Sequence, residues 1–545
     1  MLKRMGLYWN TLRYLKPEQI YRRIWFSFIK PMPQTSDAPS MRTVQGEFKT
    51  AIIKKPGLNN AYEFEALNVK VDIQSPAIWN DATQSQLWLY HLHYFDDLSS
   101  GQDGQNDDFY KDLILRWIDE NPPGQGIGWD PYPVSKRIVN WIFWLLRTKN
   151  SDIKIKHSLA IQARWLAKRL EYHLLGNHLF ENAKALVICG LFFEGPEADK
   201  WLRLGSRILD VELQEQVLSD GGHFERSPMY HNIFVNGLLD LVNVFTAYDR
   251  QDLPLNKKIV GIVPQMMHWS KVMSHPDGDI SFFNDSTFGV APSIAELEAY
   301  ALRLDIHSSK RSLNGITYLN SSGFVRMQKD KAVVLADIGS VGPRYLPGHA
   351  HAGTLSFELS LDSQRIVVNS GISTYDVSNS RLEQRSTKAH NTVVIDGKNS
   401  SEVWSSFRVA RRASTYDIDK FEGEDELKFM CSHNGYARRY GGSTHKRMWL
   451  LRDTTLDIED EISGDFNSAG AYFHFEPSIM LQQKTLDQTS SCFDCQAHSI
   501  EFTVGSPKAS LKDSKYSPEF GLSINNQVVS FGIEGGGLKS VLKWS

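Results

Sequence analysis

The chain has 545 residues, of which 41% are hydrophobic and 23% charged, a composition typical of a globular protein large enough for two or three domains. Its 60 basic and 63 acidic residues give a net charge of −3, which argues against broad nucleic-acid binding because that function usually needs a strongly basic domain. A local basic region that binds an acidic sugar is still compatible with this balance.

Residues 1–30 combine basic and aromatic side chains, and charges interrupt every apolar run. The segment therefore lacks the apolar core and the small-residue cleavage site of a signal peptide. We interpret it as a pair of amphipathic helices that packs on the body of the protein or touches a membrane surface. No stretch approaches the roughly 20 apolar residues that cross a bilayer. The expected location is the cytoplasm, with a periplasmic or surface-associated location as the alternative.

The rest of the first half has a helical pattern. Apolar residues recur at three- and four-residue spacing through residues 159–174, 178–193, 201–217, 232–248, 259–273 and 294–304. Short connectors that contain Gly, Pro or Asp separate these segments. Serial helices with short loops predict stacked antiparallel hairpins, as in a bundle, a solenoid or an (α/α) toroid. We find no repeat of fixed period, which weighs against a solenoid.

The pattern changes near residue 314. Short β-branched or alternating runs follow at 316–327, 332–337, 354–361, 365–370, 391–396, 472–476 and 528–533. Helices first and strands afterwards indicate an α+β protein of separate domains rather than a doubly wound sheet. We therefore expect a helical domain over residues 1–310 and an antiparallel β-sandwich over residues 311–545.

Two polar clusters precede predicted helices. Asn177, His178 and Glu181 lie at the start of one helix, where exposed backbone N–H groups favour an anion; a capped helix start is the simpler explanation. Tyr230 and His231 follow a glycine turn at the start of another helix. A tyrosine can donate or accept a proton in catalysis, although most such rings serve only in packing.

Two further clusters precede predicted strands. His349 and His351 are spaced i and i+2 on an extended segment, so they face the same side and suit one metal, or one metal and one substrate contact. Arg385 and Lys388 supply two cations shortly before His390. A solvated loop would equally explain the Arg and the Lys.

Taken together, these clusters resemble the heparinase II/III-like polysaccharide lyases. The matching segments are NHLFENAKAL (177–186), DGGHFERSPMYH (220–231), GHAHAGTLSFEL (348–359), VVNSGISTY (367–375) and RSTKAHNTVVIDGKNSSEVWSSFRVARRA (385–413). Several are long and unusual, and they occur in the family's order. The start of the chain, including LYWNTLRYLKPEQIYRR (7–23), resembles members found in bacterial surface-polysaccharide gene sets.

The resemblance implies an N-terminal (α/α) toroid followed by a C-terminal β-sandwich, with the site between them and an acidic polysaccharide or oligosaccharide as substrate. It implies catalytic roles for Asn177, His178, Tyr230 and His349, with Asn177 and His178 neutralising a uronate carboxylate and Glu181 orienting them. Arg385, Lys388 and His231 are expected to make further substrate contacts.

The resemblance also implies a metal, usually zinc, at His351 and His390. Relatives commonly have an acidic residue where this chain has Gly353, and many read DSG where it has Asn369-Ser370-Gly371. Asn369 can offer a carbonyl oxygen, but without the charge that strengthens a zinc site. We therefore treat one divalent metal at His351, His390 and Asn369 as a hypothesis that the missing carboxylates weaken.

The activity implied is β-elimination from a uronic acid polymer, in which hydrogen bonds to the carboxylate stabilise the charge that develops when the C5 proton leaves. Tyr230 is the expected proton donor or acceptor, with His178 or His349 as the base for an anti elimination. One alternative is a glycoside hydrolase, which needs two carboxylates across the bond, here Glu181 and Glu225. The other is a non-catalytic polysaccharide-binding or biosynthetic partner.

Overall fold

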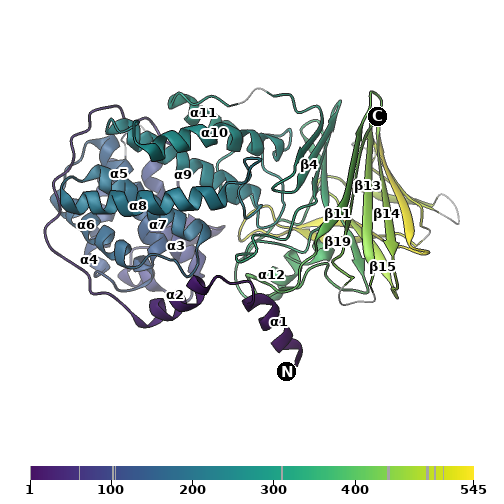
Figure 1. Cartoon of the computed structure of the whole chain (residues 1–545), viewed down its shortest axis with the longest axis horizontal. Helices are drawn as coiled ribbons and strands as arrows, with labels where there is room; N and C mark the ends of the chain where they lie inside the picture. The colour runs from purple at the N-terminus through teal and green to yellow at the C-terminus, as the bar shows by residue number, and fades with distance from the viewer. Residues whose placement is uncertain are drawn as a thin grey trace.

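The structure is a computed structural model that describes every residue except 1, 60–61, 101–103, 105, 309–310, 438–441, 486–489, 496–498 and 507. Its helical half and its sheet half lie side by side along the longest axis (Figure 1). Within the described ranges, no helix has the combination of length and apolar character that a bilayer-spanning segment requires.

The first half is helical, as predicted, with one small hairpin of β1 (Glu63–Ala66) and β2 (Val69–Asp72). Its α-helices are α1 (Leu2–Leu12), α2 (Pro17–Phe28), α3 (Gln86–Tyr94), α4 (Asp107–Glu120), α5 (Pro131–Thr148), α6 (Ile153–Lys168), α7 (Gly176–Phe192), α8 (Pro196–Gln216), α9 (Pro228–Ala247), α10 (Pro254–Val272) and α11 (Ile294–Arg303). Short 3-10 turns lie at η1 (Pro76–Asn80), η2 (Asp96–Ser99) and η3 (Ile127–Trp129).

Helix α7 is the centre of the helical half. It packs against α5, α6, α8 and α9, and an apolar sequence all round the helix suits such a position. Every residue of α7 except His178 is buried. The one polar group that this helix exposes therefore lies at its N-terminal end, toward the sheet half.

The second half is built of antiparallel strands. They are β3 (Gly315–Leu319), β4 (Phe324–Lys329), β5 (Ala332–Asp337), β6 (Phe357–Leu361), β7 (Gln364–Val367), β8 (Val393–Ile395), β9 (Val403–Trp404), β10 (Arg408–Val409), β11 (Thr415–Glu422), β12 (Leu427–His433), β13 (Thr444–Arg452), β14 (Thr455–Ser463), β15 (Ala469–His474), β16 (Gln482–Thr485), β17 (Ser491–Cys495), β18 (Ile500–Val504), β19 (Ser510–Tyr516), β20 (Ile524–Gly532) and β21 (Gly537–Trp544). A short helix, α12 (Asn379–Gln384), and a 3-10 turn, η4 (Thr387–Ala389), lie between β7 and β8.

The strands form three larger sheets around one apolar core. Their orders are β3-β4-β5-β6-β7, β19-β20-β15-β8 and β11-β12-β13-β14-β21-β18-β17-β16. Side chains from all three sheets, including Phe357, Phe473 and Trp449, meet in this core. The run at 316–327, predicted as a single strand, is a hairpin because its polar residues 320–323 form the turn between β3 and β4.

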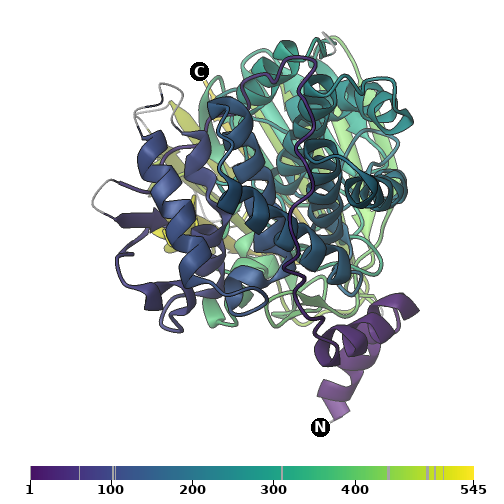
Figure 2. The same ribbon diagram turned by 90° about the vertical axis from the view of Figure 1, so that its left-hand side faces the viewer.

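The first two helices lie apart from the rest of the helical half. In Figure 1 they occupy the lower edge, and the view turned by 90° also places them at one corner of the molecule (Figure 2). The predicted pair of N-terminal helices is therefore present and is peripheral to the toroid-like body.

Candidate active site

His178 lies in the first turn of α7 and is held by a carboxylate. Leu175 and Gly176 both adopt left-handed backbone conformations, with φ of 63° and 55°, and turn the chain into the helix. The His178 Nδ1 atom lies 3.1 Å from Glu171 Oε1, and the His178 side chain is 38% exposed. Burial alone would lower the pKa of His178, but attraction to Glu171 outweighs it, so the net pKa is raised. A histidine whose protonated form is favoured in this way, at a helix N-terminus, suits an anionic ligand.

Asn177 lies next to a tyrosine that the sequence did not single out. Its Nδ2 donates to Tyr132 Oη at 3.0 Å, and the Tyr132 ring centroid lies 4.7 Å from that of His178. Burial raises the pKa of the Tyr132 hydroxyl, and the charge of Lys136, one turn later on α5, acts to lower it. Asn177, His178 and Tyr132 therefore form a compact set of donors at one end of the helical half.

Tyr230 is placed by the start of α9. The Ser227 side chain caps the helix by accepting from Tyr230 N at 3.1 Å, and Pro228 occupies the first helical turn, as expected for such a start. Tyr230 Oη lies 3.0 Å from Tyr375 Oη, and its ring centroid is 4.0 Å from that of His349. Burial, with Tyr375 and Asp285 nearby, raises the pKa of Tyr230 well above its ordinary value. The phenol is therefore protonated at neutral pH.

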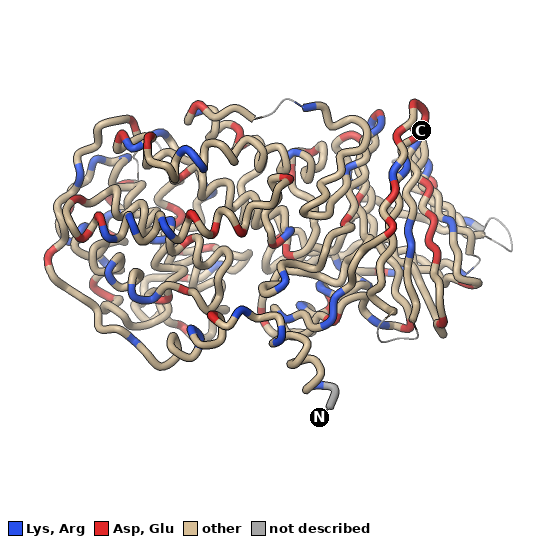
Figure 3. Tube along the Cα trace, in the orientation of Figure 1, with Lys and Arg blue, Asp and Glu red and all other residues tan. Residues whose placement is uncertain are grey.

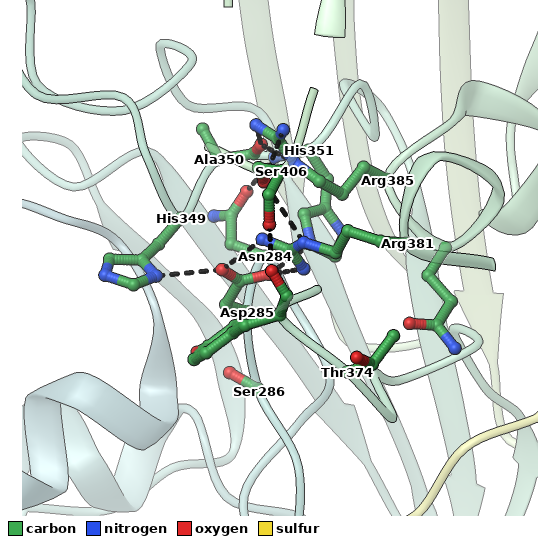
Figure 4. A network of polar contacts seen from close by, with 12 residues as sticks. Asn284, Asp285, Ser286, His349, Ala350, His351, Thr374, Arg381, Arg385 and Ser406 are labelled. Atoms are coloured by element: carbon green, nitrogen blue, oxygen red, sulfur yellow. Dashed lines mark hydrogen bonds and ion pairs between the residues drawn. The ribbon is translucent and has the colours of Figure 1, made fainter. Parts of the chain in front are cut away.

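Asp285 connects the two halves of the site (Figure 4). It lies between α10 and α11 and is fully buried. Its carboxylate accepts from His349 Nδ1 and His351 Nε2, each at 2.8 Å, and from both terminal nitrogens of Arg381. Arg381 and the two histidines hold the pKa of Asp285 well below its usual range. Because an ionised carboxylate only accepts, His349 Nδ1 carries a proton, and in the neutral ring His349 Nε2 would present a lone pair.

The structure brings together the three residues predicted to hold a metal. His351 Nδ1 lies 3.2 Å from His390 Nε2, and His390 Nδ1 lies 3.0 Å from Asn369 Oδ1. Burial lowers the pKa of His351 to about 4 and that of His390 well below its usual range. Both rings are therefore neutral near pH 7, and each of their four nitrogens already faces a protein atom.

This donor set does not suit zinc. A zinc site in a protein takes three or four ligands, and the described residues contain no group of three or more His, Cys, Asp or Glu side chains that could hold a metal ion. The Nδ2 atom of Asn369 is buried without a partner. With the amide turned so that Nδ2 faces His390, hydrogen bonds run from Asn369 to His390, from His390 to His351 and from His351 to Asp285. A carboxylate at position 369 could not donate in this way.

Two predicted substrate contacts are buried inside the helical half. Glu181 is 0% exposed and pairs with Lys184 at 2.9 Å and Lys136 at 3.7 Å. It does not contact His178, whose partner is Glu171. His231 is also 0% exposed; its Nε2 donates to the Met266 carbonyl and its Nδ1 accepts from the backbone of His223. Neither side chain can reach a substrate in this conformation.

The two predicted cations lie in different environments. Arg385 is buried, and its guanidinium donates to the backbone carbonyls of Ala350, Ser405 and Ser406, so it braces loops instead of facing a ligand. Lys388 is exposed, but its ammonium lies 5.7 Å from the Tyr472 ring on β15. No contact joins either cation to Tyr230 or His178.

Glu225 interacts electrostatically with both ends of the site. Burial raises its pKa, while His349 and His178 both act to lower it. These two histidines come from the sheet half and the helical half, so Glu225 lies close to both. The α7 end and the Asp285 network thus form a single site between the two halves.

Sequence reasoning missed Glu171, Asp285, Tyr375 and Arg381, in addition to Tyr132. Tyr375 and Arg381 lie in or beside the matching segments that were quoted, so their position was a usable signal. Asp285 lies in the connector FFNDSTFG, whose Asn284 adopts a left-handed conformation with φ of 57°. Its polar run between apolar residues was the only local indication of a functional role.

Comparison with known proteins supports the resemblance seen in the sequence. Residues 25–310 match the family described as heparinase II/III N-terminus, and residues 311–536 match the heparinase II/III-like C-terminal family. A heparin-sulfate lyase of Bacteroides stercoris is 25% identical over 315 residues, which is 54% of this chain and 44% of that protein. The chain thus spans less than half the length of that relative.

Two other matches widen the comparison. FtsZ-localized protein C of Caulobacter vibrioides is 24% identical over 403 residues, which is 71% of this chain and 66% of that protein. The crystal structure of heparinase III superposes with a TM-score of 0.69 at 18% identity, covering 85% of this chain and 78% of that one. This likeness confirms the predicted fold, a helical toroid followed by a β-sandwich.

Proposed function

Because this chain belongs to the heparinase II/III family, we propose that it is a polysaccharide lyase that cleaves an acidic, uronic acid-containing polysaccharide by β-elimination. The observation that carries the proposal is the arrangement at Tyr230. The ring of a protonated phenol packs against that of His349, whose Nδ1 is hydrogen-bonded to an ionised, buried aspartate. That arrangement supplies a proton donor and a proton acceptor next to each other.

The helical side of the site is suited to the substrate carboxylate. The C5 proton of a uronate is weakly acidic while the adjacent carboxylate carries its full charge. His178, whose pKa Glu171 raises, and the amide of Asn177 would bind that carboxylate and stabilise the charge that develops on it. His178 is the one residue of α7 that is not buried, and Asn177 lies directly beside it in the first turn of the helix.

The sheet side is suited to proton transfer. His349 Nε2 would take the C5 proton, the C4–C5 double bond would form and the bond from C4 to O4 would break. Tyr230 would donate its proton to the leaving O4. Asp285 holds the His349 ring in the tautomer that this step requires. No step in this scheme passes through a metal.

The hydrolase alternative is disfavoured by the position of Glu181. A hydrolase needs two carboxyl groups that both reach the glycosidic bond. Glu181 is fully buried against Lys184 and Lys136, and Glu225 is buried as well. The two groups that were candidates for that mechanism therefore lack access to a sugar.

The test is the ultraviolet absorbance of the unsaturated uronate during incubation with a panel of acidic polysaccharides. We expect absorbance to rise with the wild-type protein, and Tyr230→Phe to lower kcat by about 10²- to 10⁴-fold because it removes the proton donor. Tyr472→Phe is the matched control, since Tyr472 lies on β15 outside the site, and it should retain full activity.

Other outcomes would count against the proposal in distinguishable ways. New reducing ends without absorbance would indicate hydrolysis. Binding of a polymer without either signal would indicate a non-catalytic module. An equal loss in both tyrosine variants would show that Tyr230 has no special role.

A further inference from the structure

Helix α2 is amphipathic with its apolar face turned away from the protein. Ile20, Tyr21, Ile24, Trp25 and Phe28 are all exposed, with Phe28 at 81%, and their spacing places them on one side of the helix. The opposite side faces the body, where Gln19 is buried. A surface helix of a globular protein normally shows the reverse arrangement.

Helix α1 repeats the pattern. Met5, Trp9 and Leu12 lie one turn apart and are exposed, with Trp9 at 69%. Beyond α2, Ile29 and Met32 continue the apolar surface, with Met32 at 84%. Single exposed apolar residues are ordinary, but a contiguous set of large ones marks a surface that binds something.

The body holds both helices in this orientation. Arg169 donates to the carbonyls of Phe26 and Ile29 at the end of α2, and Lys16, between the helices, forms an ion pair with Glu215 of α8. On α1, Thr11 accepts from the Trp404 indole at 3.1 Å. The rings of Tyr8 and Phe26 also pack on Trp404 and His173 of the body, while the outer apolar side chains named above stay exposed.

The charge of the segment identifies the partner. Residues 1–30 contain seven Lys or Arg and a single acidic residue, Glu18, although the whole chain has a net charge of −3. Arg4, Arg13, Arg23 and Lys30 are exposed around the apolar faces, and Figure 3 marks basic positions along this edge of the molecule. Apolar and aromatic side chains bordered by Lys and Arg are the features of helices that lie in the interface of an anionic bilayer.

We propose that the surface formed by the outer faces of α1 and α2, the N-terminal patch, binds peripherally to membranes that contain anionic lipids. A second copy of the chain is the less suitable occupant, because it would bring two patches of the same net positive charge together. Membrane binding would also place the site near the lipid surface. Trp404, which contacts α1, belongs to the β9–β10 hairpin, whose Phe407 ring lies 5.8 Å from that of His349.

The test is co-sedimentation of the full chain with vesicles of phosphatidylcholine alone and of phosphatidylcholine mixed with phosphatidylglycerol. We expect binding to the mixed vesicles, much weaker binding to the neutral ones, and release as salt screens the charges. Ile24→Ser/Trp25→Ser/Phe28→Ser should lower binding at least about tenfold, because it removes the apolar side chains that would enter the interface.

The matched control is Ile153→Ser/Leu302→Ser, which removes two apolar side chains that are 80% and 60% exposed on α6 and α11. It should bind vesicles like the wild type, and both variants should melt at the wild-type temperature since every changed residue is exposed. Equal binding by the two variants would overturn the proposal, as would failure of the wild type to bind anionic vesicles. Concentration-dependent dimerisation lost in the triple variant, without vesicle binding, would assign the patch to a second copy instead.

Discussion

The protonation of His178 depends on one carboxylate, that of Glu171, which is seven residues away in sequence. Glu171 raises the pKa of His178 against the opposing effect of burial. A raised pKa means that the protonated form is favoured in the folded protein. The resulting stabilisation is present below the ordinary histidine pKa and is lost as the pH rises through the raised value. Carboxylate binding by His178 should follow the same direction.

Removal of that charge tests the role of His178. In Glu171→Gln we expect the pKa of His178 to fall, so that the alkaline limb of the kcat/KM profile moves to lower pH. The measurement is the pH dependence of kcat/KM for both proteins. Glu194→Gln is a control for the loss of one acidic charge elsewhere. An unchanged profile would show that protonation of His178 does not limit the reaction.

We expect the side chain at position 369 to determine whether the neighbouring histidines bind a metal. As an amide it can donate to His390 and complete a chain of hydrogen bonds that ends at Asp285. As a carboxylate it could only accept, and the lone pairs of His390 and His351 would then face each other. The residue at position 369 therefore decides whether the histidine pair is satisfied without a cation.

We expect Asn369→Asp to destabilise the metal-free protein by about 1–3 kcal/mol, the cost of an unmade buried hydrogen bond. Added zinc should recover the melting temperature in the variant and leave the wild type unchanged, because a ligand that binds only the folded state stabilises it. The measurement is thermal unfolding with a chelator and with zinc. A zinc-dependent rise in the wild type would show that the amide site also holds metal.

At the scale of elements, the site is built on the first turns of α7 and α9. Both helices begin shortly after a residue with a positive φ, Leu175 for α7 and Arg226 for α9, and the first residue of α7, Gly176, also has a positive φ. Such conformations are costly for most residues and persist where the surroundings enforce them. The two turns bring His178 and Tyr230 to the same end of the helical half.

Gly176 can be replaced to test this requirement. A Cβ atom there would lie 2.5 Å from Leu346 Cδ2 and 2.9 Å from Glu225 Oε1, in addition to the left-handed strain. We expect Gly176→Ala to lower the free energy of unfolding by about 1–3 kcal/mol and to lower kcat/KM. The comparison is Gly261→Ala, where nothing lies within 4 Å and alanine should be neutral or stabilising. Equal effects on unfolding would argue against a constrained α7 start.

For the whole molecule, Asp285 joins the helical half to the sheet half. Its carboxylate reaches His349, His351 and Arg381, all from the sheet half, and all three contacts are largely removed from water. Arg226 adds a second connection by donating to the carbonyls of Ser322 and Gly342. The groups proposed for catalysis, which come from both halves, are therefore positioned by the same contacts that hold the halves together.

Loss of the Asp285 carboxylate should destabilise the protein by about 3–5 kcal/mol, because Arg381 is left buried without a counter-charge. Asp285→Ala/Arg381→Met should be less destabilised than Asp285→Ala alone, since the unpaired cation is also removed. Calorimetric melting of the wild type, Asp285→Ala, Arg381→Met and the double variant measures both effects. Additive losses would show that the two side chains do not act as a pair.

The sequence by itself determined the order of helices and strands and the point at which the sheet half begins. It also placed Asn177, His178 and Tyr230 at helix starts and His349 just before a strand. Periodicity and capping residues act locally, so they can be read along the chain. Only the tertiary structure decided that Glu171 and not Glu181 holds His178, that His231 and Arg385 are buried, and that Asp285 enters the site. It also decided that the apolar face of α2 points outward. Burial and ion pairing join residues far apart in sequence, and packing alone sets which of them meet.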